Sequence, residues 1–202
     1  MKKFFVFLSV MAIAATSANA QNANFGLKAG MTASNMKFTG GDNLGGFSVN
    51  ASTKIGFYAG VISELNVAED FAIQPELYYS LLGAKAKGDI ASGKLDLSYV
   101  SLPVLAKYTH DGFSAFAGPQ IGYLISSKTK ANGQTEDIKD EMNSIDFSGV
   151  IGLGYTLPNG FGLDARYQAG IANIAKESEG GKAINNAFMV GIHYFFNKQA
   201  AY

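Results

Sequence analysis

The chain alternates apolar and polar residues along eight separate segments, and this pattern constrains its fold more than any other feature. The segments are residues 25–32, 55–64, 71–81, 95–108, 113–126, 147–157, 161–171 and 188–196. Successive side chains of a β-strand point to opposite faces, so the pattern predicts eight strands, each with one apolar and one polar face. Leu95 and Leu97 break the alternation of the fourth segment, which predicts a β-bulge near Ser98.

Short and long connections alternate between these segments. The short ones are residues 66–70, 109–112 and 158–160, and the last two contain Asp-Gly and Asn-Gly pairs. Such pairs are typical of hairpins, because both residues tolerate positive φ. The long connections are polar and are predicted to be solvated loops. They comprise residues 35–51, 83–94, 128–143 and 173–184.

Glycine placement indicates which face of the strands points outward. Eight alternating strands fit a soluble barrel or sandwich with an apolar core, or a membrane barrel with its apolar face outward. The polar face carries Gly26, Gly30, Gly56, Gly60, Gly118, Gly122, Gly152, Gly154, Gly162, Gly170 and Gly191, and only Gly149 lies on the apolar face. A crowded lumen needs glycine beside long side chains, whereas glycine only weakens a solvated strand. This placement favours the membrane barrel.

Ionisable residues of both signs lie on the same polar face. They are Lys28, Glu64, Glu76, Lys107, Asp164, Arg166 and His193. This mixture suits a closed lumen in which the ions are paired, because an unpaired ion is costly in a low-dielectric interior. We expect Arg166, the only arginine, to pair with Glu76 or Glu64 across the lumen. The alternatives are an ordinary solvated strand face and a conduction or gating role.

These features predict an all-β fold, an eight-stranded antiparallel up-and-down transmembrane β-barrel in an outer membrane. An even number of strands places both termini at the periplasmic end, together with the short turns, and the long loops outside the cell. A barrel of eight strands has room only for side chains or one small ligand, so a general diffusion pore is not expected.

The start of the chain predicts a secretory signal peptide at residues 1–20. Met1-Lys2-Lys3 is followed by an apolar run at residues 4–15 and by Ala18-Asn19-Ala20 at the cleavage position. The apolar run is too short to cross a bilayer, which takes about twenty residues. We expect cleavage to leave one exported barrel domain at residues 21–202. Losing two of the sixteen basic residues against sixteen acidic ones changes the net charge from zero to −2.

The sequence offers little support for catalysis or cofactor binding. Near-neutral charge provides no field for nucleic acid, and the absence of cysteine excludes disulfides, thiol nucleophiles and thiolate metal sites. His193 invites a Ser-His-acid interpretation, but its predicted place is the lumen and no G-x-S-x-G element exists. The acidic run Glu136, Asp137, Asp140 and Glu141 lacks the spacing of a Ca²⁺ loop. We therefore predict no enzyme activity, no cofactor and no metal site.

Several sequence blocks together resemble the PorT-like outer-membrane β-barrel proteins, often called the porin family. The blocks are residues 56–60, 73–79, 99–103, 117–122, 152–155 and 164–167, within a resemblance that covers about residues 25–196. The last strand also resembles the C-terminal signal read by the barrel-assembly machinery, with Gly191, Tyr194 and Phe196 as its marker residues. The resemblance implies an integral outer-membrane protein, although members of this family share no single activity.

The leading functional prediction is a non-enzymatic membrane scaffold or surface-binding protein that acts through its long extracellular loops. The PorT-like resemblance implies a second candidate, a component or assembly factor of an outer-membrane secretion system. A small-solute channel or a lipid-modifying enzyme is the third. The expected partners are outer-membrane lipids, the barrel-assembly machinery during biogenesis, and an extracellular or secretion-system protein.

Overall fold

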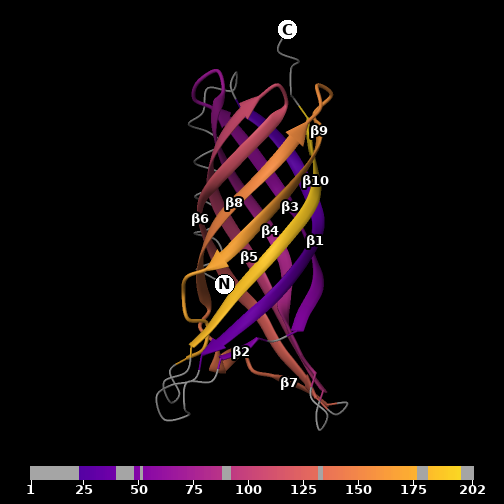
Figure 1. The fold of residues 1–202 in the computed structure, drawn as a ribbon, viewed down its shortest axis with the longest axis vertical. Helices are drawn as coiled ribbons and strands as arrows, with labels where there is room; N and C mark the ends of the chain where they lie inside the picture. The colour runs from indigo at the N-terminus through magenta and orange to yellow at the C-terminus, as the bar shows by residue number, and fades with distance from the viewer. Residues whose placement is uncertain are drawn as a thin grey trace.

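A computed structural model describes residues 23–39, 48–50, 52–87, 92–131, 134–176 and 182–196. The predicted signal peptide lies outside these residues. Within them, eight long strands form the wall of a barrel (Figure 1). They are β1 (Ala23–Thr39), β3 (Ser52–Asn66), β4 (Phe71–Lys87), β5 (Ser92–His110), β6 (Phe113–Ala131), β8 (Ile145–Thr156), β9 (Phe161–Gly170) and β10 (Lys182–Phe195). Shorter elements are β2 (Ser48–Asn50), β7 (Gln134–Asp137) and the 3-10 helix η2 (Lys139–Glu141).

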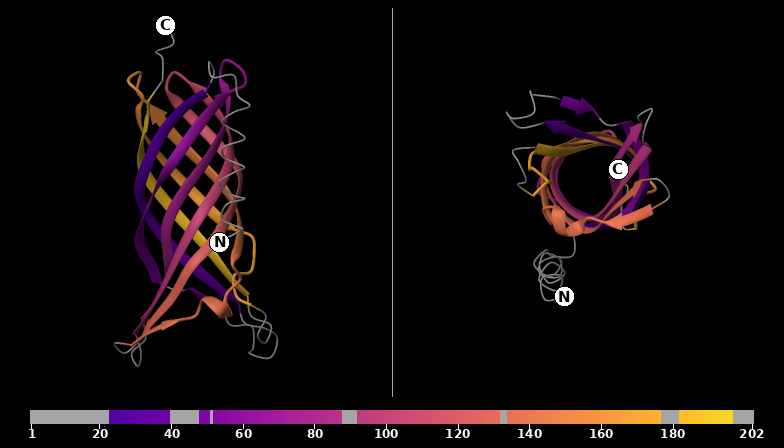
Figure 2. Two further views of the ribbon diagram at one scale, coloured as in Figure 1. Left: turned by 180° about the vertical axis from the view of Figure 1, so that it is seen from behind. Right: turned by 90° about the horizontal axis from the view of Figure 1, so that it is seen from below.

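The sheet closes on itself. Each long strand pairs antiparallel with the strands before and after it in the chain, and β1 pairs with β10 from Gly26↔Phe195 to Thr39↔Lys182. The view along the barrel axis shows the strands as a ring around a central lumen (Figure 2). Closure pairs the backbone groups that an open sheet would leave at its edges. The predicted eight-stranded up-and-down barrel is confirmed.

The two ends of the barrel differ. Turns at residues 67–70, 111–112 and 157–160 lie at one end, together with the end of β10 (top of Figure 1), and we call this the turn end. At the opposite end, which we call the loop end, the strands run further than predicted. β4 and β5 remain paired to Lys87↔Ser92, and β5 and β6 to Gly93↔Ala131. Much of the predicted loops at 83–94 and 128–143 is therefore strand. Backbone pairing continues there, although these residues are too polar to face lipid.

A bulge lies at the predicted place, but its cause differs from the predicted one. Ser98 pairs with Ser126 whereas Tyr99 pairs with Leu124, so the extra residue is Ile125 in β6 rather than a residue of β5. Leu97 does not turn outward, because it is fully buried on the lumen side. The break in the alternation of the fourth segment therefore reflects apolar side chains that pack inside the lumen at this level.

The apolar faces of the strands point outward, as the glycine pattern predicted. The outer surface carries exposed aliphatic and aromatic side chains such as Leu27, Met31, Phe57, Phe113, Ile151, Leu153, Leu163 and Phe188. The chain has no described helix that is long and apolar enough to cross a membrane. The buried side chains lie inside the barrel, where they fill the lumen.

Candidate functional site

The centre of the lumen holds a network of buried ions that joins opposite walls. Arg166 on β9 makes a two-pronged contact with Glu76 on β4, with Nη1–Oε2 and Nη2–Oε1 distances of 2.7 and 3.1 Å. These strands lie opposite each other, because β5, β6 and β8 separate them along the sheet. Lys28 on β1 approaches from between them, with its Nζ 3.2 Å from Glu76 Oε2. Of the two partners predicted for Arg166, the structure therefore selects Glu76.

Asp164 balances the charge of this network. Its Oδ1 lies 3.4 Å from Lys28 Nζ, and its Oδ2 accepts a hydrogen bond of 3.1 Å from Arg166 Nε. Two cations thus face two carboxylates, and all four side chains are almost completely buried. Gln74 also donates to Glu76 at 2.6 Å. Such charge-assisted contacts offset much of the cost of removing the ions from water.

A second buried ion pair lies closer to the turn end. Lys107 Nζ on β5 is 2.6 Å from Glu64 Oε2 on β3. Asn24 donates to the other oxygen of Glu64, and the ring of Phe195 lies below the Lys107 ammonium group at 5.4 Å. Glu64, the other partner predicted for Arg166, thus has a cation of its own.

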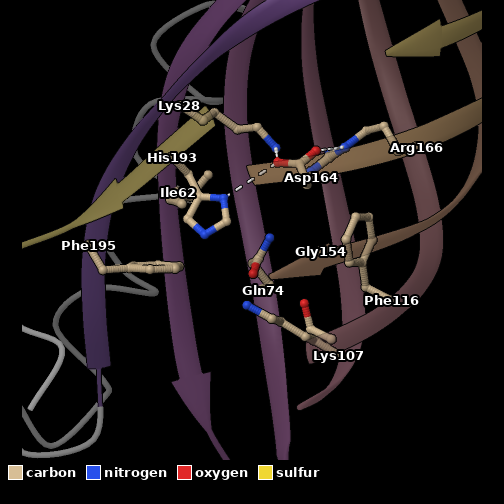
Figure 3. Close-up of a pocket in the computed structure, with 11 residues that line it drawn as sticks. Lys28, Ile62, Gln74, Lys107, Phe116, Gly154, Asp164, Arg166, His193 and Phe195 are labelled. Carbon is tan, nitrogen blue, oxygen red and sulfur yellow. Dashed lines mark hydrogen bonds and ion pairs between the residues drawn. The ribbon is translucent and has the colours of Figure 1, made fainter. Parts of the chain in front are cut away.

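A small cavity separates the two ion clusters, and His193 lines it (Figure 3). Its volume is about 10 Å³, which is room for about one water molecule. His193 Nε2 is 3.0 Å from Thr156 Oγ1, and Nδ1 is 3.6 Å from Asp164 Oδ1. The hydroxyl–imidazole–carboxylate order resembles a catalytic triad, but an acyl substrate does not fit in this cavity. His193 serves here as a lumen hydrogen-bonding group.

Glycines give the large lumen side chains their space, as predicted. A Cβ on Gly152 would lie 2.5 Å from the Phe116 ring, which itself stacks under the Arg166 guanidinium group at 4.9 Å. A Cβ on Gly191 would overlap the hydroxyl group of Tyr58. By contrast, a Cβ on Gly149, the exception on the outer face, would meet no atom within 4 Å.

The loop-end half of the lumen contains a large apolar cluster beside buried polar side chains such as Lys54, Asp146 and Asn185, and the alternation along the strands did not predict this cluster. Buried apolar and aromatic side chains pack there into one cluster, which we call the lumen plug: Met36, Tyr58, Tyr78, Leu82, Ala84, Leu97, Tyr99, Leu124, Met142, Ile174, Ala183, Ala187 and Met189. The available signal was the position of Leu97, Leu124 and Met189 on inward-facing sites of their strands. Together with the ion network, the lumen plug fills the barrel.

Two loop segments complete the lumen plug. Met142 follows η2, Ile174 lies in the segment between β9 and β10, and both are buried in the cluster. A β-bridge joins Met142 to Ala175, and the Asn143 amide donates to the carbonyls of Asn173 and Ala175 at 2.9 and 3.1 Å. These two segments therefore cover the loop end of the lumen as one unit.

Two sets of predicted residues lie outside the lumen clusters: the acidic run before β8 and the marker residues near the end of β10. Glu136 and Asp137 lie in β7, and Asp140 and Glu141 lie in η2. Over the residues that the structure describes, no group of three or more histidine, aspartate or glutamate side chains is placed to hold a metal ion. Near the end of β10, Gly191 lines the lumen, and the rings of Tyr194 and Phe196 contact each other on the outer face at 5.6 Å. Their part in assembly stays a prediction.

A closed barrel with an apolar outer surface and a polar, ion-paired centre defines an integral outer-membrane protein. Comparison with family models agrees, because residues 19–176 match the model described as "Outer membrane protein beta-barrel domain". The chain belongs to this family.

Solved structures support the same fold. Neisserial surface protein A is similar with a TM-score of 0.55 and 16% sequence identity, over 87% of this chain and 100% of that one. Ail, the attachment invasion locus protein of Yersinia pestis, is similar with a TM-score of 0.50 and 17% identity, over the same shares of both chains. Among curated proteins, none matches the chain.

Proposed function

We propose that this protein is a non-enzymatic scaffold or surface-binding protein of the outer membrane that acts through its loop end. The observation that carries the proposal is the occupied lumen, which the buried side chains of the ion network and of the lumen plug fill over the part of the chain that the structure describes. A barrel with an occupied lumen can still bind partners at its exposed ends. The solved barrels of the same fold include proteins named for the cell surface and for attachment, so the architecture is compatible with this role.

The loop end is the better candidate for binding. The described part of this end includes strand extensions, β7 and η2, whereas the turn end has only three short turns. In outer-membrane barrels the short turns face the periplasm and the longer loops face outward. We therefore assign the loop end to the cell exterior.

Single cysteines test both the orientation and the binding role, because the native chain has none. Thr135→Cys places a thiol on exposed β7 at the loop end, and Glu69→Cys places one in an exposed turn at the other end. On intact cells, a membrane-impermeant maleimide is expected to label only Thr135→Cys. A thiol-directed crosslinker is then expected to give a discrete adduct from Thr135→Cys alone. Labelling restricted to Glu69→Cys, or the absence of an adduct from Thr135→Cys, would contradict the proposal.

The PorT-like resemblance supports a second candidate, a component or assembly factor of an outer-membrane secretion system. Its sequence blocks at residues 56–60, 73–79 and 164–167 contribute Tyr58, Glu76 and Arg166 to the lumen, so the resemblance concerns the barrel more than the loop end. Deleting the gene is then expected to abolish secretion of cargo, and a barrel with shortened loops is expected to restore it. Normal secretion in the deletion strain would exclude this candidate.

A further inference from the structure

Beyond the lipid-facing band, the wall formed by β4, β5 and β6 carries a row of lysines. Lys85 pairs with Lys94, and Lys94 pairs with Lys130, so the three lie side by side on adjacent strands. They point away from the lumen, because they alternate with Ala84 and Leu95, which pack in or against the lumen plug. Figure 1 shows this extension of the wall at the foot of the barrel, beside β7.

The carboxylate of Asp96 joins two lysines of this row, Lys94 and Lys130, to Lys54 on β3. The oxygens of Asp96 lie 2.8 Å from Lys54 Nζ, 3.2 Å from Lys94 Nζ and 3.7 Å from Lys130 Nζ. The carboxylate of Asp96 thus holds three ammonium groups close together.

The cluster keeps an excess of positive charge. Four lysines with accessible side chains, Lys85, Lys94, Lys128 and Lys130, form what we call the lysine patch, and Lys54 adds a buried charge beside Asp96. Asp96 and Asp137, the pairing partners of Lys128 on either side, are the acidic residues that share this face in the described strands. Lys94 and Lys130 keep about half of their side-chain surface exposed. The lysine patch thus has free ammonium groups and a surplus of positive charge.

The patch lies at the depth of lipid headgroups. Tyr123 and Ile125 are the last exposed apolar residues of the outer face of β6, and on β4 the hydroxyl of Tyr79 donates to Ser98 at 3.0 Å. Lys94 is four residues beyond Ser98. At about 3.3 Å per residue and a tilt of roughly 40°, the lysine row is about 10 Å further along the membrane normal. It therefore faces sideways, at the level of the polar part of the bilayer.

We propose that the lysine patch binds the phosphate groups of the phosphorylated glycolipid in the outer leaflet. Adjacent strands are about 4.8 Å apart, so lysines paired across them can contact the same phosphate. The lipid supplies the opposite charge at the matching depth, and its acyl chains lie against the apolar face directly below. The inference uses the orientation assigned above, but it concerns the lateral surface of the barrel and not the loop-end binding of a protein.

The test measures lipid binding by purified protein in detergent micelles. Native mass spectrometry compares a lipid A that carries two phosphates with the same lipid after enzymatic removal of its phosphates. The unmodified protein is expected to bind the phosphorylated lipid more tightly by tenfold or more, with the preference decreasing as salt rises. Equal binding of the two lipids overturns the proposal, and this comparison requires no variant.

A matched pair of variants locates the site. Lys94→Gln/Lys130→Gln removes two charges from the lysine patch, and Lys37→Gln/Lys182→Gln removes two exposed charges from the β1–β10 side of the same end. The first variant is expected to lose about 25-fold in affinity, because each lysine beside a charged lipid surface contributes about fivefold. The second variant is expected to lose little. Lys94→Arg/Lys130→Arg keeps the charge and should retain binding. Equal losses in both Gln variants overturn the assignment.

Inorganic phosphate distinguishes a lipid site from a site for free anions. It is expected not to displace the phosphorylated lipid at millimolar concentration, because it lacks the acyl chains that contact the apolar face. Displacement at that concentration overturns the lipid assignment. The lipid test needs only purified protein and lipid, whereas the crosslinking test needs intact cells. Lipid binding by the lysine patch can therefore be confirmed when crosslinking at the loop end fails, and the reverse also holds.

Discussion

Replacing Glu76 with glutamine tests whether the central ion network stabilises the barrel through balanced charge. Glu76 is fully buried, and Lys28, Arg166 and Gln74 all donate to its carboxylate. Glu76→Gln changes the shape of the side chain very little. It leaves two buried cations facing the single carboxylate of Asp164.

The expected cost follows from this imbalance. Removing one partner of a buried ion pair destabilises a protein by about 3–5 kcal/mol, because the remaining charge is left uncompensated. The double variant Glu76→Gln/Lys28→Met has one cation and one carboxylate, Arg166 and Asp164, which already lie 3.1 Å apart. We expect the double variant to recover more than half of the stability that Glu76→Gln loses, even though it departs from the native sequence at one more position.

Equilibrium urea unfolding in detergent micelles provides the measurement. Circular dichroism follows the strand content, since the chain has no tryptophan for fluorescence. Gel mobility before and after heating checks that each variant forms a barrel. The charge-balance argument is refuted if Glu76→Gln costs less than about 1 kcal/mol, or if the double variant is less stable than the single one.

Three further predictions concern other parts of the barrel. Gly152→Ala should lower the free energy of unfolding by about 1–3 kcal/mol, because the added Cβ meets the Phe116 ring. In the same urea titration, Gly149→Ala should change it by less than about 0.5 kcal/mol, because its Cβ meets no atom within 4 Å. Asn143→Ala removes two hydrogen bonds between the segment after η2 and the segment between β9 and β10. Proteolysis of residues 172–176 should therefore become about five- to tenfold faster. An unchanged rate would show that these bonds do not hold the two segments over the lumen. In planar bilayers the protein should show no discrete conductance steps, because side chains fill its lumen, and regular steps would contradict a filled lumen.

The sequence predicted the wall of the barrel well because lipid tolerates few exceptions. Outward positions within the bilayer are predominantly apolar, so residues such as Ile151, Leu153 and Leu163 show the strand period directly. The same parity identified the lumen ions. It could not choose between Glu64 and Glu76 as the partner of Arg166, because both face inward. That choice depends on how the strands are staggered around the ring, and alternation within single strands does not encode the stagger.

The loop end was predicted less well because its constraints differ. Beyond the lipid, backbone pairing alone maintains the strands, so Lys85 and Lys94 lie in a paired sheet although their segment has the composition of a loop. The lumen plug was missed for a related reason. Leu97 and Met189 are apolar residues at inward positions, and a rule that places apolar residues outward treats them as irregularities. Met142 and Ile174 come from loops, where no period indicates burial.

The arrangement of the four central ions links charge balance to closure of the barrel. Lys28 and Glu76 lie in the N-terminal half of the chain, and Asp164 and Arg166 lie in the C-terminal half, so each half contributes one cation and one carboxylate to the network. Neither half must bury an unpaired ion before the two meet. When β1 pairs with β10, Arg166 reaches Glu76 across the lumen and Lys28 reaches Asp164, so the contacts between the two halves, including the short Arg166–Glu76 contact, form only in the closed ring. The network thus favours the closed barrel over an open sheet without requiring a charged intermediate in the membrane.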